Sequence, residues 1–195
     1  PHNATAVWTN DGRLTLWSST QGAFGVREQT AGLLRMPESM VKVNPVEIVG
    51  GFGGKTVVYL PPIAALLAKK SGRPVKMQMD RRAVFEATGP TPGGKLTVKM
   101  GVNDDGKITA ATTHIWFESG AYPGSAVAAA AICIFSPYTI ENTRIDGYDI
   151  VVNKPKSGAY RAPGSPQGAF ACESVVDEIC EIKGWDRLEF RLNNA

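Results

Sequence analysis

Residues 46–55 constrain the fold more than any other stretch of this chain, because four of the five residues 50–54 are glycines. Glycine destabilises the interior of a helix or strand, so such a run indicates a turn with positive φ angles or a backbone that lies very close to another group. The apolar residues Val46–Val49 predict a short buried strand before the run, and the apolar residues 63–70 predict a helix after it. A strand, a glycine loop and a helix in this order predict a cradle of backbone N–H groups for an anion.

One function for such a cradle is nucleotide binding by a phosphate-binding loop, which requires Gly, any four residues and then Gly-Lys-Ser/Thr. Residues 54–56 match the end of this pattern, but Val49 stands where its first glycine belongs. The prolines at positions 61 and 62 also place the helix start later than in such a loop. A nucleotide-binding protein therefore remains an alternative, and so does a tight turn in a structural or interaction fragment.

The charge and cysteine patterns argue against several classes of partner. The 21 basic and 18 acidic residues are interspersed, so we expect neither a nucleic acid nor a membrane surface as a partner. The longest apolar run, residues 126–135, is too short to cross a bilayer, and the start carries no secretory signal. Cys133, Cys172 and Cys180 form no Cys-x-x-Cys pair, which argues against a disulfide framework or an iron–sulfur or zinc site. We therefore expect a reducing, cytoplasmic compartment.

Two turn signals predict hairpins. Asn-Asp-Gly at residues 10–12 predicts a hairpin over residues 5–18, which places a Ser-Thr-Gln segment at the end of a strand. Asp-Asp-Gly at residues 104–106 joins two alternating segments over residues 95–117. His114 lies in the second hairpin with no other ligand type at metal-binding spacing, so we interpret it as a packed side chain.

Helical periodicity predicts amphipathic helices over residues 26–35 and 167–183. The length suits one domain or one large piece of a bigger one. The chain begins at Pro1 and ends just after a helical pattern, so we interpret residues 1–195 as a single-domain fragment of a larger polypeptide. The residues expected on the buried helix faces are Val26, Ala31, Leu33 and Leu34 in the first, and Phe170, Cys172, Val175, Val176, Ile179 and Cys180 in the second.

Four stretches together resemble the molybdenum hydroxylases, the family of xanthine dehydrogenase and aldehyde oxidase. Residues 50–55 are similar to the family's Gly-Gly-Gly-Phe-Gly-Gly-Lys loop, with Val49 in place of its first glycine. Residues 19–21 match its Ser-Thr-Gln motif. Residues 159–167 resemble its Ala-(Phe/Tyr)-Arg-Gly-Phe-Gly-x-Pro-Gln motif, and residues 1–4 resemble the end of its Glu-Pro-His motif. The motifs keep the family's order over nearly the whole chain.

The resemblance implies an α+β fold of mixed or antiparallel sheets with packed helices, one lobe of a molybdenum-cofactor-binding domain. The implied cofactor is a molybdenum-pyranopterin, either molybdopterin or its cytosine dinucleotide form. It holds molybdenum through its own dithiolene sulfurs, so no side chain is expected to ligate the metal. The resemblance also implies an oxidoreductase that hydroxylates an aldehyde or an N-heterocycle with water as the oxygen source.

By position in the motifs, Gln21 and Arg161 are the implied catalytic residues. Gln21 would face an oxygen ligand of the metal, and Arg161 would lie in the wall of the active site. The backbone of Gly51, Phe52 and Gly53 would complete the cofactor contacts beside the oxo group. Hydrogen-bond donors are needed where charge develops on oxygen, and these residues supply them. From spacing alone, an amide that satisfies a loop and an ordinary surface arginine remain the alternatives for Gln21 and Arg161.

The carboxylate base of the family lies near its C-terminus, outside this chain, so we expect the isolated fragment to be inactive. The implied partners are the remainder of the molybdenum subunit, iron–sulfur and flavin (FAD) domains or subunits, and a second copy in a dimer of the parent complex.

Three positions bear on the substrate. The family's purine hydroxylases have Glu directly after the loop lysine, where this chain has Thr56. They have Arg thirty-two residues before the motif arginine, which falls at Ala129, and an aromatic residue where this chain has Pro163. We therefore do not expect xanthine as the substrate. The aerobic carbon monoxide dehydrogenases have Cys directly after the motif arginine, and Ala162 in this chain argues against that chemistry.

Overall fold

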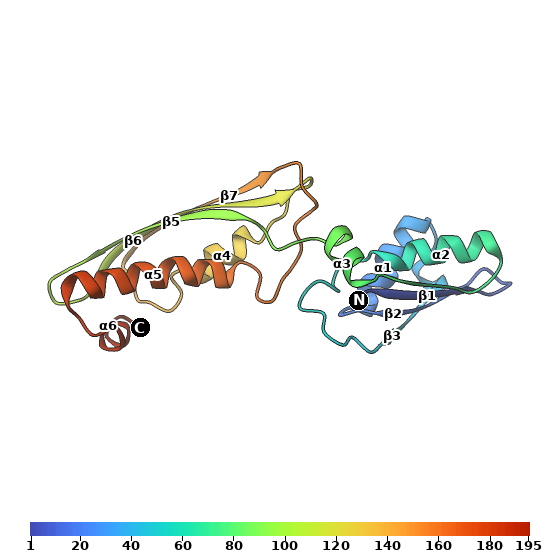
Figure 1. Cartoon of the computed structure of the whole chain (residues 1–195), viewed down its shortest axis with the longest axis horizontal. Helices are drawn as coiled ribbons and strands as arrows, with labels where there is room; N and C mark the ends of the chain where they lie inside the picture. The colour runs from blue at the N-terminus through green and yellow to red at the C-terminus, as the bar shows by residue number, and fades with distance from the viewer. The chain divides into compact units, whose positions relative to one another are not determined.

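The computed structural model describes residues 1–195 and divides them into two compact units, each with its own sheet. The first unit comprises residues 1–90 and 158–161, and the second comprises residues 91–157 and 162–195. Helices pack on a mixed sheet in each unit, which confirms the predicted α+β fold (Figure 1). None of the helices combines the length and apolar character that a membrane crossing requires.

The sheet of the first unit has the strand order β3-β2-β1-β4. Strands β1 and β2 form the predicted antiparallel hairpin, with Ala4 opposite Ser18 and Trp8 opposite Leu14. β3 runs parallel to β2, and β4 runs antiparallel to β1. This register brings the end of β2, and with it the Ser-Thr-Gln segment, beside the end of β3. The bounds are β1 Asn3–Trp8, β2 Leu14–Ser19, β3 Val41–Val46 and β4 Val75–Gln78.

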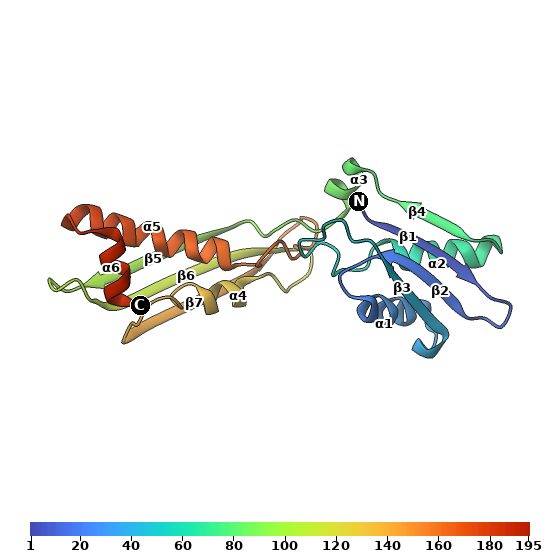
Figure 2. The same cartoon turned by 90° about the horizontal axis from the view of Figure 1, so that it is seen from below.

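Helices α1 (Ala23–Leu34) and α2 (Leu60–Ser71) cover one face of this sheet (Figures 1 and 2). The core between them is small-residue and aliphatic, and it includes Ala4, Leu16 and Ala64 with no exposed surface. The small side chains let α2 lie close to the sheet. The prediction for Leu33 is wrong, because that side chain is 68% exposed. The short elements η1 (Glu38–Met40) and α3 (Arg81–Ala87) complete the unit.

The prediction of a buried strand over Val46–Val49 is wrong. Strand β3 ends at Val46, and the side chains of Ile48 and Val49 are exposed. Val49 adopts φ 51° and Gly50 adopts φ 96°, so the chain already turns where the glycine run begins. A β-branched residue rarely adopts this left-handed conformation, which the apolar pattern could not reveal.

The sheet of the second unit has the strand order β5-β6-β7. β5 (Gly94–Val102) and β6 (Ile108–Gly120) form the second predicted hairpin, and β7 (Asn142–Val151) runs parallel to β6. Alternate residues of β6, among them Ile115 and Phe117, are buried toward the helices. His114 points to the other face, where its ring stacks on Trp116.

Helices α4 (Val127–Cys133) and α5 (Ser165–Lys183) pack on one face of this sheet, and α6 (Arg187–Asn194) packs against the end of α5. Cys172 and Cys180 are buried, as predicted for core residues. Burial raises the pKa of the Cys172 thiol to about 11, which suits an unreactive core position. The prediction for Phe170 is wrong, because its ring is 78% exposed.

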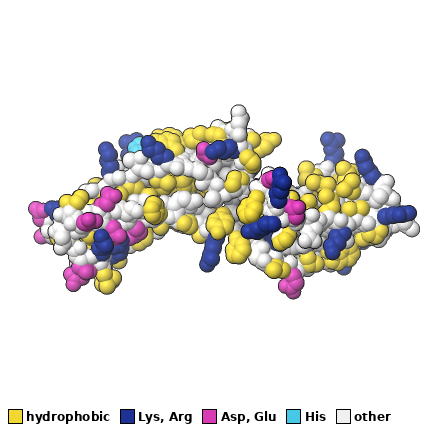
Figure 3. Space-filling model, in the orientation of Figure 1, with side chains coloured by type: hydrophobic (Ala, Val, Ile, Leu, Met, Phe, Trp, Pro, Cys, Tyr) yellow, Lys and Arg dark blue, Asp and Glu magenta, His cyan; other side chains and the backbone are white.

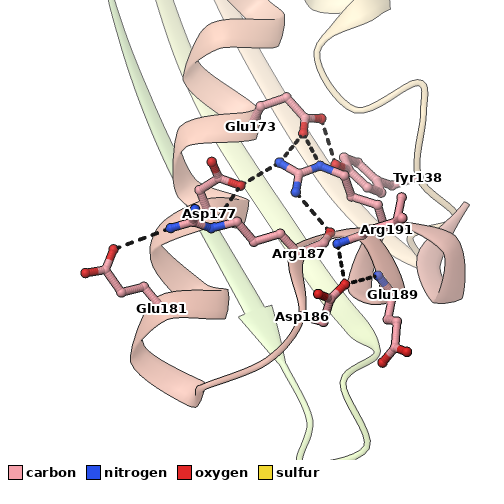
Figure 4. Close-up of polar contacts among 9 residues, drawn as sticks. Tyr138, Glu173, Asp177, Glu181, Asp186, Arg187, Glu189 and Arg191 are labelled. Atoms are coloured by element: carbon pink, nitrogen blue, oxygen red, sulfur yellow. Dashed lines mark hydrogen bonds and ion pairs between the residues drawn. The ribbon is translucent and has the colours of Figure 1, made fainter.

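A polar network centred on Arg191 ties α6 to α5 (Figure 4). Arg191 Nε donates to Glu173 Oε2 at 2.8 Å, and its Nη2 donates to Asp177 Oδ1 at 2.8 Å. Tyr138 Oη donates to the other oxygen of Glu173 at 2.7 Å. Burial and the Glu173 hydrogen bond raise the pKa of Tyr138, so the phenol stays a donor. Several charge-assisted bonds that share one guanidinium hold α6 more firmly than an isolated surface pair would.

Replacing Arg191 with methionine should speed hydrogen exchange in peptides that cover α6 and lower the Tm by a few degrees. The Arg191 hydrogen bond lowers the pKa of Asp177 below its ordinary value of 3.8. That stabilisation is present above pH 3.8 and lost as the pH falls through the lowered pKa, so wild type and variant should converge at acidic pH. Arg187→Met is the matched control, since its nearest carboxylate oxygens lie at 3.8 Å. Equal effects of the two variants would contradict this role.

Candidate functional site

The glycine loop, residues 50–55, is a series of tight turns in the first unit. Gly54 N donates to Gly51 O at 2.8 Å, and Thr56 N donates to Gly53 O at 3.2 Å. Phe52 and Gly53 have φ angles of 50° and 91°, so the loop needs the conformational freedom of glycine at position 53. The N–H groups of Gly50, Gly51 and Phe52 donate to no other group of the chain. The loop therefore presents free backbone donors.

Gln21 lies over this loop and is held by it. Its Oε1 accepts from Gly53 N at 2.9 Å and from Lys55 N at 3.2 Å. Its backbone N donates to Lys55 O at 3.0 Å. Both oxygen contacts come from backbone donors, so they define which side of the carboxamide carries the oxygen. The Nε2 group donates to no atom of the chain and is free to meet a ligand.

Two glycines make these close contacts possible. A Cβ on Gly51 would lie 2.5 Å from Gln21 Oε1. A Cβ on Gly53 would lie 2.7 Å from Ala159 O, which is a backbone atom that cannot rotate away. The glycines therefore serve contacts within the protein itself, whatever the loop binds.

Residues 158–161 lie against the loop and belong to the same unit. Arg161 N donates to Phe52 O at 2.9 Å, and Gly158 N donates to Pro90 O at 2.7 Å. The guanidinium of Arg161 forms no ion pair or hydrogen bond in the chain, and the side chain is exposed. Gln21, the loop and the backbone of Arg161 thus come together from three distant parts of the sequence, while the catalytic roles of Gln21 and Arg161 stay predictions.

Lys55, the lysine of the phosphate-binding pattern, does not face an open cradle. The residue is 6% exposed, and its Nζ donates to Ser19 Oγ at 2.5 Å and to Ile48 O at 2.6 Å. Burial lowers the pKa of the Lys55 amine. Helix α2 starts only at Leu60, so its N-terminus does not complete the glycine loop either. These contacts disfavour a nucleotide-binding role for the motif.

The three predicted substrate-pocket residues are divided between the units. Thr56 belongs to the first unit, where its Oγ1 donates to Gly53 O at 2.6 Å. Ala129 and Pro163 belong to the second unit and are half-buried. There Gly164 packs against Ala126 and Ala130, which places the turn that holds Pro163 beside the helix that holds Ala129. Their joint role in one pocket stays a prediction.

The comparison with protein families decides among the alternatives. The model of the molybdopterin cofactor-binding domain matches residues 1–195. The chain belongs to this family. It is a molybdopterin cofactor-binding domain, which confirms the class of protein and of cofactor that the four motifs imply.

Curated and solved relatives agree with the family. The domain is 34% identical over 195 residues to a probable xanthine dehydrogenase subunit of Bacillus subtilis (strain 168), covering 97% of this chain and 26% of the relative. It is 34% identical to the aldehyde oxidoreductase molybdenum-binding subunit PaoC of Escherichia coli (strain K12), covering 100% of this chain and 26% of the relative. The crystal structure of quinoline 2-oxidoreductase from Pseudomonas putida 86 matches with a TM-score of 0.92 and 26% identity, over 100% of this chain and 26% of that one. The domain spans about a quarter of the length of these relatives.

The donor set fits a molybdopterin cofactor. Gln21 Nε2, the free loop amides and the Arg161 guanidinium can all donate hydrogen bonds to oxygen, and none of them is a usual metal ligand. Such a set suits a cofactor that carries its own metal ligands.

Sequence reasoning missed the part that Lys55 plays in holding Gln21. Lys55 belongs to the loop motif and Ser19 to the Ser-Thr-Gln motif, and nothing in either motif indicates that their side chains meet. The available signal was that both motifs contain a polar residue with no assigned role, thirty-six positions apart.

Proposed function

We propose that this molybdopterin cofactor-binding domain is part of a larger molybdenum-binding subunit, here called the parent protein. The parent protein would be an oxidoreductase that hydroxylates an aldehyde or an N-heterocycle with water as the oxygen source. The proposal is supported by the short span of the domain relative to its relatives, and by their names, which include a xanthine dehydrogenase, an aldehyde oxidoreductase and a quinoline 2-oxidoreductase.

The observation that supports this function best is the held carboxamide of Gln21. Its oxygen is occupied by two backbone donors, so its Nε2 is directed away from the loop with no partner of its own. A donor held in advance of the reaction stabilises charge that develops on a nearby oxygen more effectively than a mobile one. The bound molybdenum-pyranopterin would supply the redox chemistry, in its molybdopterin or cytosine dinucleotide form. Gln21 would donate a hydrogen bond to an oxygen ligand of the cofactor's metal. Arg161 would provide a positive charge in the wall of the active site.

The cofactor contacts would come from Gly51, Phe52 and Gly53 together with Gln21 and Arg161. Gly53 N is already used by Gln21, so the free N–H of Phe52 is the better candidate for a direct contact with the cofactor. This refines the expectation that the backbone of Gly51, Phe52 and Gly53 contacts the cofactor together.

Thr56, Ala129 and Pro163 would line the substrate pocket of the parent protein. None of them carries a charge, so a purine's polar edges would be left poorly paired once water is excluded. A less polar aldehyde or N-heterocycle suits these side chains better. Efficient oxidation of xanthine or hypoxanthine by the parent protein would contradict this part of the proposal.

The partners would be the remainder of the molybdenum subunit and iron–sulfur and flavin domains or subunits, in a soluble cytoplasmic complex that forms a dimer. Val49, Phe52 and Tyr160, in or beside the glycine loop, are exposed large hydrophobic side chains. Figure 3 shows further hydrophobic side chains exposed between the charged ones. Many exposed large apolar side chains are typical of surfaces that other protein covers. Residues 1–195 alone are accordingly expected to show no turnover.

Replacing Gln21 with alanine in the parent protein should lower kcat by about 10²–10³-fold, the usual cost of removing one preorganised donor. Molybdenum content and Tm should change little, because the backbone of the loop keeps its own turns. Activity on a panel of aldehydes and N-heterocycles, metal analysis and thermal unfolding would test this. Gln29→Ala, on the exposed side of α1, is the control. Unchanged turnover in the Gln21 variant would contradict the proposed function.

A further inference from the structure

We propose that Lys55 is a positioning residue that holds Gln21 in its reactive orientation through a buried ammonium group. This inference rests on the proposed function, because it concerns how the Gln21 donor is kept in place. It assigns a role to the lysine of the glycine loop, whose ammonium group is buried and explained neither by cofactor contact nor by nucleotide binding.

The side chain of Lys55 connects the two segments that lead into the site. Its Nζ donates to Ser19 Oγ at the end of β2 and to Ile48 O before the glycine run. Ser19 Oγ also lies 3.4 Å from Ile48 O, so the three polar groups form a closed triangle. The ammonium therefore fixes the distance between the Ser-Thr-Gln segment and the glycine loop.

The backbone of Lys55 contacts the same segment. Lys55 N donates to Gln21 Oε1, and Lys55 O accepts from Gln21 N at 3.0 Å and from Thr20 Oγ1 at 3.2 Å. Gln21 is thus bound through both its main chain and its side chain to the residue whose ammonium holds Ser19. A shift of Lys55 would move Gln21 Nε2 with it.

The Lys55 ammonium is a buried cation without a carboxylate partner, so its burial costs free energy. No carboxylate forms an ion pair with Lys55, and the cavity beside it measures about 10 Å³, room for one water molecule at most. Burial lowers the pKa of the Lys55 amine, and burial followed by the Lys55 charge lowers the pKa of His2 in the same cavity wall. Buried charges of this kind contribute little net stability compared with an apolar side chain of the same size.

The function of the Lys55 ammonium is to orient the Ser-Thr-Gln segment relative to the glycine loop. An apolar side chain at position 55 would fill the space, but it would leave Ser19 Oγ and Ile48 O without their shared donor. Ser19 could still donate to Ile48 O, so the unit would fold while the two segments move relative to each other. A displacement of about 1 Å in a group that acts on the reacting atoms can cost about 10²-fold in rate.

A double-mutant cycle in the cofactor-loaded parent protein tests this inference. The variants are Lys55→Met, Gln21→Ala and the double variant, with Lys70→Met on α2 as the matched control because Lys70 is exposed and forms no polar contact. Lys55→Met should lower kcat about 10- to 100-fold with little change in KM. In the Gln21→Ala background, Lys55→Met should have almost no further effect, since the group it positions is gone.

A second readout does not depend on turnover. Hydrogen exchange of peptides that cover residues 19–21 and 50–56 should become faster in Lys55→Met and stay unchanged in Lys70→Met, at equal molybdenum content. Should Lys55→Met fail to fold, Ser19→Ala enters the same cycle, because it removes one acceptor and leaves the ammonium bound to Ile48 O. It should show a smaller loss of kcat that also disappears in the Gln21→Ala background.

The outcomes separate this inference from the function on which it rests. The positioning role would be overturned if the double variant lost kcat by the product of the two single losses. It would also be overturned if Lys55→Met changed neither kcat nor hydrogen exchange. Either result would leave the proposed function standing. No effect of Gln21→Ala by itself would overturn both. Recovery of exchange protection and rate in Lys55→Arg, which keeps a cation at this position, would support it.

Discussion

Replacing Gly53 with valine in the parent protein should remove most of its bound molybdenum and with it the activity. Gly53 adopts φ 91°, which costs a residue with a side chain about 1–2 kcal/mol. Its Cβ would also lie 2.7 Å from Ala159 O and 2.9 Å from Ala159 C, so the loop and residues 158–161 must separate. That separation breaks the Arg161 N to Phe52 O hydrogen bond and displaces the backbone on which Gln21 rests.

The expected loss is local, because Gly53 lies outside every helix and strand of the first unit. Metal analysis should therefore show a larger change than the Tm. Gly22→Ala is the control, since Gly22 directly follows Gln21, has extended backbone and has no atom within 4 Å of an added Cβ. Normal metal loading and turnover in Gly53→Val would show that the contact with Ala159 is dispensable for the site.

Replacing Gly120 with alanine should prevent the second unit from folding. Gly120 ends β6 with φ 78°, and an added Cβ would lie 2.1 Å from Pro155 O and 2.7 Å from Lys156 Cα. Both neighbours are backbone atoms, and they are held nearby by Ala121 N to Lys154 O and Ser157 N to Ser119 O at 3.0 and 2.9 Å. A change of side-chain rotamer cannot relieve this clash, because the clashing atoms belong to a backbone that hydrogen bonds hold in place.

The measurement is soluble yield followed by limited proteolysis, with cleavage expected within residues 91–157 in the variant. Gly101→Ala is the matched control on the partner strand β5, because its nearest atom lies 3.5 Å from an added Cβ and its φ is not positive. A protease-resistant Gly120→Ala protein would contradict the expected loss.

Local chemistry explains which parts of the fold the sequence could predict. The Asn-Asp-Gly and Asp-Asp-Gly turns define their hairpins within a few residues, and both hairpins are confirmed. The parallel pairs β2–β3 and β6–β7 join strands that are far apart in the chain, and no local signal reports them. The backbone at Val49 could not be predicted either, because an apolar pattern indicates burial but does not indicate a positive φ angle.

The same contrast between local signals and long-range contacts holds for the candidate site. The motif positions assign Gln21, the glycine loop and Arg161 to one cofactor site, and the structure places all three in the first unit, while their roles there stay predictions. The bonds that hold them could not be read from the motifs, because the partner of Gln21 Oε1 is a backbone amide and the partner of the Lys55 ammonium is a hydroxyl on another strand. Side-chain identity predicts such contacts only once the backbone path is known.

The first unit is discontinuous in sequence, and this sets the order in which the site can be assembled. Residues 1–90 leave the ribosome before residues 158–161, which supply Ala159 and Arg161. Until that late segment arrives, Gly53 has nothing to pack against, and the Gly158 N to Pro90 O hydrogen bond cannot close the unit. Cofactor insertion during synthesis would therefore have to wait for almost the whole domain, so a nascent chain stalled before residue 158 should bind no molybdopterin.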